Sequence, residues 1–144
     1  MFLKRFLAAT LLLIPLIATH AFADVRLPNV ISSHMVLQQG KPVHIWGWAE
    51  PGEQVEVSFA GQKKTTQTDE NGKWLIALDP LKANKTPATM SISGKNSISL
   101  EDLLVGEVWV CSGQSNMEWS MAQTEQGKDE IPKANHPQIR LYDV

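Results

Sequence analysis

The chain has 144 residues, enough for one domain or for one domain and part of a second. Its formal net charge is −2 and it contains no basic stripe or block, which argues against nucleic acid as a partner. The single cysteine, Cys111, excludes a fold held together by internal disulfides, so stability must come from an apolar core.

Residues 1–23 have the organisation of a secretory signal peptide. Lys4 and Arg5 supply positive charge, an apolar stretch follows, and Ala21-Phe22-Ala23 matches a cleavage site. The apolar stretch is short for a membrane-spanning helix, although an uncleaved anchor is the alternative. We expect an exported protein, periplasmic or extracellular, that starts at Asp24 and leaves the membrane after cleavage. Its mature chain would carry 11 basic and 15 acidic side chains.

Residues 24–104 are predicted to form a β-sandwich domain. The segment Gln54–Phe59 alternates apolar and polar residues, as a half-buried strand does. Asn71-Gly72 favours a tight hairpin turn over residues 69–73, and no stretch keeps a helical period. Several short strands separated by turns are typical of a sandwich. Further strands are expected at Val43–Trp48, Trp74–Leu78, Met90–Ile92 and Ile98–Leu100.

The character of the sequence changes near residues 103–106. From Val105 to Cys111 the residues are nearly continuously apolar, apart from Gly106 and Glu107, as in a strand buried on both faces of a parallel sheet. Residues 118–130 are expected to begin a helix and residues 139–144 a second strand. The predicted fold class is therefore mainly β, with residues 105–144 as the start of an incomplete α/β domain.

A serine follows the predicted buried strand directly. The order strand, Gly113, Gln114, Ser115 would present a hydroxyl at the edge of the sheet, where the next backbone N–H groups can face a developing oxyanion. Ser115 is therefore the candidate nucleophile of an ester hydrolase. The pattern is not the Gly-x-Ser-x-Gly elbow, because Met117 holds the second glycine position. An ordinary turn that uses Gly, Ser and Asn is the alternative.

The block Cys-Ser-Gly-Gln-Ser-Asn-Met-Glu at residues 111–118 resembles the first conserved block of the sialate O-acetylesterases, a family of the SGNH-hydrolase group. The resemblance extends through the Val-Gly-Glu-Val-Trp that precedes it and through most of residues 27–74. It implies an SGNH-type, three-layer hydrolase domain over residues 105–144. It also implies that Ser115 is the nucleophile, and that Gly113, Gln114 and Asn116 shape the turn and line the substrate and oxyanion region.

The same resemblance implies an enzyme that hydrolyses acetyl esters on carbohydrates. The sequence contains no metal-ligand cluster and no phosphate-binding glycine loop, so neither a metal nor a cofactor is expected. The family's remaining oxyanion donors and its Asp and His come from later blocks, which this sequence does not contain. We therefore expect this chain to be close to inactive by itself. His34 and His44 are expected to be structural, and His136 lacks an Asp at the family's Asp-x-x-His spacing. The sequence does not indicate the oligomeric state.

A hypothesis of another class is a secreted, non-catalytic β-sandwich that binds glycans or a partner. Residues 105–144 would then be a remnant of a hydrolase domain. Trp46, Trp48 and Trp74 would line a sugar-binding face in that case, but core packing is the more common use of tryptophan in a sandwich. Cys111, inside an apolar segment, is expected to be a small buried residue.

Overall fold

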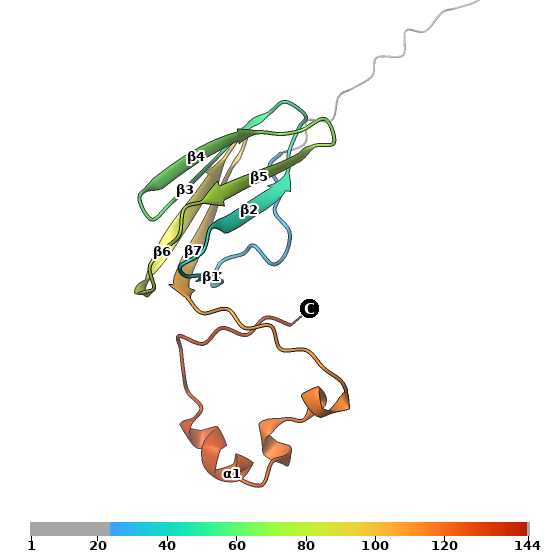
Figure 1. Ribbon diagram of the computed structural model, residues 1–144, viewed down its shortest axis with the longest axis vertical. Helices are drawn as coiled ribbons and strands as arrows, with labels where there is room; N and C mark the ends of the chain where they lie inside the picture. Colours follow the sequence, from blue (N-terminus) through green and yellow to red (C-terminus); the bar gives the residue numbers. More distant parts are fainter. Residues whose placement is uncertain (1–23, 144) are drawn as a thin grey trace, which may run out of the picture.

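The computed structural model describes residues 24–143, so the predicted signal peptide and Val144 lie outside the described part. Within residues 24–143, seven strands come first and four short helices follow (Figure 1). This confirms the prediction of a mainly β chain. The strands are β1 (Val36–Gln38), β2 (Val43–Trp48), β3 (Gln54–Phe59), β4 (Gln62–Gln67), β5 (Lys73–Leu78), β6 (Asn84–Ser93) and β7 (Ser97–Gly106). The helices are η1 (Ser115–Glu118), η2 (Met121–Gln123), α1 (Gly127–Glu130) and η3 (Ile131–Lys133).

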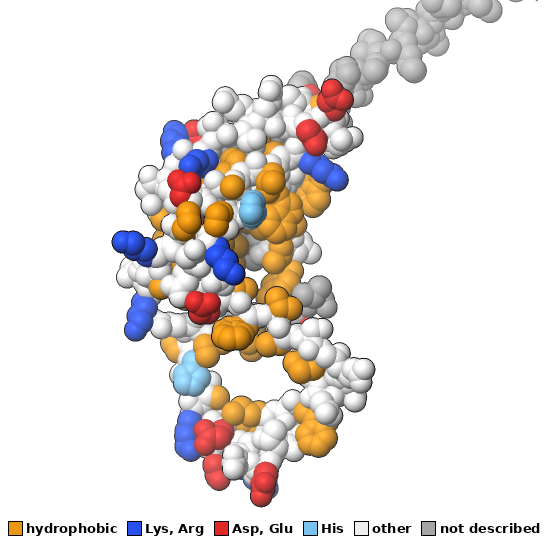
Figure 2. All heavy atoms as spheres, in the orientation of Figure 1, with side chains coloured by type: hydrophobic (Ala, Val, Ile, Leu, Met, Phe, Trp, Pro, Cys, Tyr) orange, Lys and Arg blue, Asp and Glu red, His pale blue; other side chains and the backbone are white. Residues whose placement is uncertain are grey.

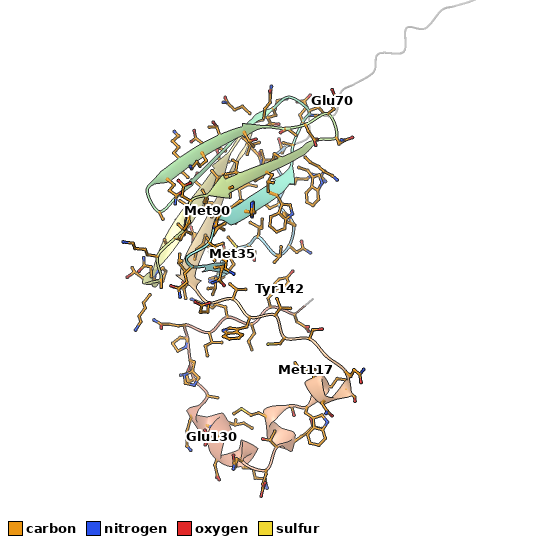
Figure 3. The ribbon with its side chains drawn as sticks, in the orientation of Figure 1. Met35, Glu70, Met90, Met117, Glu130 and Tyr142 are labelled. Atoms are coloured by element: carbon orange, nitrogen blue, oxygen red, sulfur yellow. The ribbon has the colours of Figure 1, made fainter. Side chains whose placement is uncertain are left out.

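The strands form two sheets around one core. The larger sheet has the order β1-β7-β6-β3-β4, in which only the β1–β7 pair is parallel, and the smaller sheet is the antiparallel pair β2–β5. Both sheets contribute to one hydrophobic cluster that includes Ile45, Val57, Ile76 and Met90. Met90 is fully buried where the strands converge (Figure 3).

Alternation explains why these segments form strands. In β3, Val55, Val57 and Phe59 are buried while the residues between them face outward. The smaller sheet follows the same rule, with every second residue of β2 and β5 in the core. The predicted strands at 43–48 and 54–59 are confirmed with these bounds, and the other three predicted strands are confirmed within longer ones.

The tight hairpin lies at a different turn from the predicted one. Ala60 and Gly61 connect β3 to β4, and both have positive φ, as a two-residue hairpin turn of type I′ requires. Asn71-Gly72 does form a turn, in which the Asp69 carboxylate accepts hydrogen bonds from two backbone N–H groups. That turn leads from β4 to β5, which belong to different sheets, so the hairpin prediction there is wrong.

Ala60 is a candidate for stabilisation, because alanine is strained at its φ of 49°. Asparagine tolerates this left-handed conformation. We expect Ala60→Asn to raise the free energy of unfolding by about 0.5–1 kcal/mol, measured by urea denaturation. Ala83→Asn, at an exposed alanine without positive φ, is the matched control and should gain nothing. A loss of stability in Ala60→Asn would contradict the expected relief of strain.

The predicted buried strand over residues 105–111 is wrong beyond Gly106. β7 ends at Gly106, two residues past the predicted domain boundary, and residues 107–114 have no regular structure. Trp109 is 83% exposed and Val110 91% exposed. A strand is buried on both faces only when neighbouring strands and covering helices are present, and residues 24–143 supply none at this segment. Cys111 is accordingly exposed rather than buried.

The remainder of the chain is a loop of short helical turns and extended segments below the sheets (Figure 1). The helix expected from residues 118–130 is present only as separate short pieces, and no strand forms over residues 139–143. Within residues 24–143, no helix has both the length and the apolar character needed to cross a membrane.

The tryptophans of the smaller sheet divide between its two faces. Trp74 is 3% exposed and belongs to the core, as predicted. Trp46 and Trp48 share one face, as alternation requires, but that face is the outer one and their core assignment is wrong. The reason is register: Ile45 and Gly47, which alternate with them, face inward.

Candidate functional site

Ser115 lies at the first position of η1, in the segment that follows the β-strands. Residues 111–120 are all exposed, and the residues just before Ser115 are extended rather than helical. Met117 marks this turn in Figure 3, below and apart from the strands that surround Met90. The hydroxyl of Ser115 is thus presented to solvent on a short turn, as a nucleophile must be.

The neighbours of Ser115 build a compact local turn. The Met117 N–H donates a hydrogen bond to the Gln114 carbonyl over 2.8 Å. The Met117 side chain folds over Gly113, where a Cβ would lie 2.7 Å from the Met117 Cγ, so a larger residue would displace it. The N–H of Asn116 donates to no acceptor in the described chain. One backbone donor directly after Ser115 is therefore available to an oxyanion.

No general base reaches Ser115 within residues 24–143. Its hydroxyl makes no hydrogen bond there, and neither His34 nor His136 contacts it. The same residues bring together no group of three His, Cys, Asp or Glu side chains that could hold a metal ion. Ser115 and its neighbours Gly113, Gln114 and Asn116 thus form a nucleophile turn without the groups that would activate the hydroxyl.

Two surface pockets of residues 24–143 do not include Ser115. One opens at the end of the core, between the β3–β4 turn and the start of β6. The other lies where the chain leaves β7 and is lined by Gln38, Gln39, Gly40, Lys41, Glu107, Val108 and Trp109. Neither pocket is therefore a substrate cleft around the nucleophile turn.

A charged cluster connects the segment after β7 to the strands. His34 Nδ1 lies 2.6 Å from Asp102 Oδ2, and Arg140 Nη2 lies 3.0 Å from the same oxygen. The hydrogen bond from His34 is the main reason that the pKa of Asp102 lies below its usual value, and the Arg140 charge lowers it further. The sequence predicted a structural role for His34, but its partner is 68 residues away and no local pattern indicates the pair.

A second link lies at the other end of the same segment. The Glu107 carboxylate accepts hydrogen bonds from the side-chain amides of Gln39, over 2.5 Å, and Gln38, over 3.1 Å. These bonds lower the pKa of Glu107. Gln38 Oε1 also accepts a hydrogen bond from the Val108 N–H. The segment that carries Ser115 is thus attached to the strands at both of its ends.

Both links should weaken in acid. A carboxyl whose pKa is lowered by partners in the folded chain favours the linked state at neutral pH, and this contribution is lost in acid as the pH falls through the lowered pKa. We expect residues 107–143 to exchange amide hydrogens faster there, relative to intrinsic rates, while β3 and β6 stay protected. In Asp102→Asn/Glu107→Gln the fast exchange should already be present at pH 7. An unchanged pH profile in that variant would contradict the role of the two carboxylates.

Comparison with known proteins gives a consistent result. No protein-family model matches the chain. It is 33% identical to the sialate O-acetylesterase of Mus musculus over an alignment of 150 residues, which covers 93% of this chain and 27% of the mouse protein. It is 32% identical to the sialate O-acetylesterase of Homo sapiens over 132 residues, which covers 83% of this chain and 25% of the human protein. This chain is a homologue of the sialate O-acetylesterases.

A solved structure supports the same relationship. A carbohydrate acetylesterase from Xanthomonas citri superposes with a TM-score of 0.74 at 34% sequence identity, covering 78% of this chain and 26% of that chain. The resemblance predicted from the 111–118 block is thereby confirmed. The chain spans about a quarter of the length of these relatives.

The extent of the mouse match includes the candidate nucleophile. A match over 93% of the chain leaves about ten residues unmatched, fewer than the 29 that follow Ser115. The homology therefore runs from the strands across the nucleophile turn, and is not confined to the β-strands.

Proposed function

We propose that this chain is the amino-terminal part of an exported carbohydrate O-acetylesterase that uses Ser115 as its nucleophile. The observation that carries the proposal is the homology to the sialate O-acetylesterases and to a carbohydrate acetylesterase, which in the mouse match extends across an exposed serine at the start of η1. The free Asn116 N–H beside that serine is consistent with this role. The proposed substrate is an acetylated carbohydrate.

The proposed reaction is acyl transfer in two steps. Ser115 Oγ attacks the acetyl carbonyl carbon, and its proton passes to a base while the Asn116 N–H stabilises the oxyanion. The ester C–O bond then breaks, the sugar leaves with a proton as a free hydroxyl, and an acetyl-serine remains. Water attacks this acetyl group, releases acetate and restores the Ser115 hydroxyl.

The base and further oxyanion donors would come from chain beyond the described residues. The relatives are about four times as long as this chain, so they have room for these groups. Loss of triad partners typically leaves about 10³- to 10⁴-fold acceleration over water, and that remainder needs an intact oxyanion hole. With one backbone donor and no base, the chain by itself should be close to inactive.

The domain assignment follows the same proposal. Residues 24–104 would be a β-sandwich domain, and residues 105–144 the start of an SGNH-type α/β domain. Residues 108–110 and 139–142 have no regular structure, and apart from Arg140 they are large apolar residues that are at least 49% exposed. Exposed apolar segments without paired backbone invite strand addition. We propose that both become strands of the hydrolase sheet when the remaining chain is present.

The test is acetate release from acetylated oligosaccharides by two proteins. One is this chain, and the other is the chain extended along its reading frame to the length of its relatives. We expect turnover only from the extended protein. An extended protein that folds and releases no acetate from any acetylated sugar or from p-nitrophenyl acetate would overturn the proposal.

A further inference from the structure

The outer face of the smaller sheet carries a surface that the proposed reaction does not use. His44, Trp46 and Trp48 alternate along β2 with buried residues and face outward. Directly opposite them in register on β5 are Ala77, Leu75 and Lys73. We call these six residues the aromatic shelf.

Two indole rings and one leucine make the shelf apolar. Trp46 is 40% exposed, Trp48 37% and Leu75 56%, although the other large apolar residues of the same strands are buried. Figure 2 shows hydrophobic side chains gathered over β2 and β5 at the molecular surface. Because a contiguous exposed apolar patch can mark a binding surface, this face is a candidate site.

Both residues that pair with Trp48 are cationic, and the one acidic side chain bonded to a shelf position among the described residues is Asp69, whose carboxylate accepts a hydrogen bond from the Lys73 backbone N–H. Arg26 pairs with Trp48 across a short antiparallel bridge, and Lys73 lies opposite Trp48 on the other side, so Trp48 stands between two cationic residues. Neither Arg26 nor Lys73 takes part in an ion pair within residues 24–143. No acidic residue occupies a shelf position, although the mature chain as a whole carries more acidic than basic side chains. A ligand with negative charge is therefore favoured here.

The size of the shelf favours a small ligand over a protein partner. Each partly exposed tryptophan offers on the order of 100 Å² of apolar surface, and Leu75 adds a similar or smaller area. A stable protein interface buries about 800 Å² on each partner. The apolar area of three neighbouring side chains flanked by cations is instead suited to a ligand of a few sugar-sized rings.

We propose that the aromatic shelf binds acidic carbohydrate. The C–H face of a pyranose ring would stack on Trp46 and Trp48, because the electron-rich indole face attracts the polarised C–H bonds. The carboxylate of a uronic or similar acidic sugar would accept charge-assisted hydrogen bonds from Arg26 and Lys73. This site is separate from Ser115, so it would hold acidic glycan independently of acetyl-ester hydrolysis.

The test is calorimetric titration of the chain at low salt with a matched ligand pair, trigalacturonic acid and the neutral galactose trisaccharide. We expect trigalacturonic acid to bind about tenfold more tightly, and this preference to shrink at high salt. Trp46→Ala/Trp48→Ala should weaken binding of both sugars about tenfold or more. Lys73→Gln should weaken only the acidic sugar, about threefold to fivefold.

Controls separate this site from the esterase turn and from misfolding. Trp119→Ala removes an indole that is 64% exposed on the nucleophile segment and should leave binding unchanged. Ser115→Ala should also bind normally, so failure of the esterase proposal would leave this one standing. Far-ultraviolet circular dichroism and thermal melts should match across the variants. Equal binding of the two sugars, retained binding in Trp46→Ala/Trp48→Ala, or loss of binding in the extended protein would overturn the proposal.

Discussion

Ser115→Ala, made in the protein extended to the length of its relatives, should lower kcat for acetyl-ester hydrolysis by about 10³-fold or more. Alanine at this position removes the only hydroxyl of η1 and, in the proposed mechanism, the group that forms the acetyl-enzyme intermediate. Initial rates on p-nitrophenyl acetate and on an acetylated oligosaccharide would measure the loss. Because the side chain is exposed and makes no hydrogen bond in the described residues, the fold should not change.

Ser112→Ala is the matched control for this experiment. Ser112 lies in the same block, three residues earlier, and is also exposed. Its replacement should change the rate by no more than a few-fold, because a hydroxyl that does not attack the ester contributes little. Equal losses in the two variants would indicate damage to the turn rather than loss of a nucleophile. Full activity in Ser115→Ala would remove Ser115 from the mechanism.

The fold was predictable where residue pattern and burial coincide. β2 and β3 alternate cleanly, so their bounds follow from the sequence. β4, with the sequence Gln-Lys-Lys-Thr-Thr-Gln, was not predicted because it is polar on both faces. It forms an edge strand because its backbone pairs with β3 along its whole length. A strand was expected directly after His34, where β1 lies, but its bounds do not follow from the sequence because it has three residues and depends on a parallel partner far along the chain.

The site was predictable only in part, for a related reason. Short-range features such as the Gly113–Ser115 turn depend on neighbouring residues and are visible in the sequence. The burial predicted for residues 108–111 depends on strands and helices that the described residues do not include. Asp102 is separated from His34 by 68 residues and from Arg140 by 38 residues along the chain. Contacts over such separations produce no periodic pattern in the sequence, so they could not be predicted from it.

Trp74 should be the most sensitive position of the smaller sheet. Its indole lies opposite Gly47 in the register of β2 and β5 and covers it so closely that a Cβ at residue 47 would come within 2.9 Å of the ring. An aromatic residue across from a strand glycine fills the space that the missing side chain leaves. We expect Trp74→Ala to lower the free energy of unfolding by about 3–5 kcal/mol, measured by urea denaturation.

Trp74→Phe separates packing from polarity at the same place. The Trp74 indole N–H is buried and has no hydrogen-bond partner among the described residues. Folding therefore removes its hydrogen bond to water and provides no replacement, which is unfavourable. Phenylalanine keeps a ring over Gly47 and removes that N–H, and its cost should therefore stay below about 1.5 kcal/mol. If Trp74→Phe cost as much as Trp74→Ala, the indole N–H would need a partner, and ring packing over Gly47 would not be what holds β2 against β5.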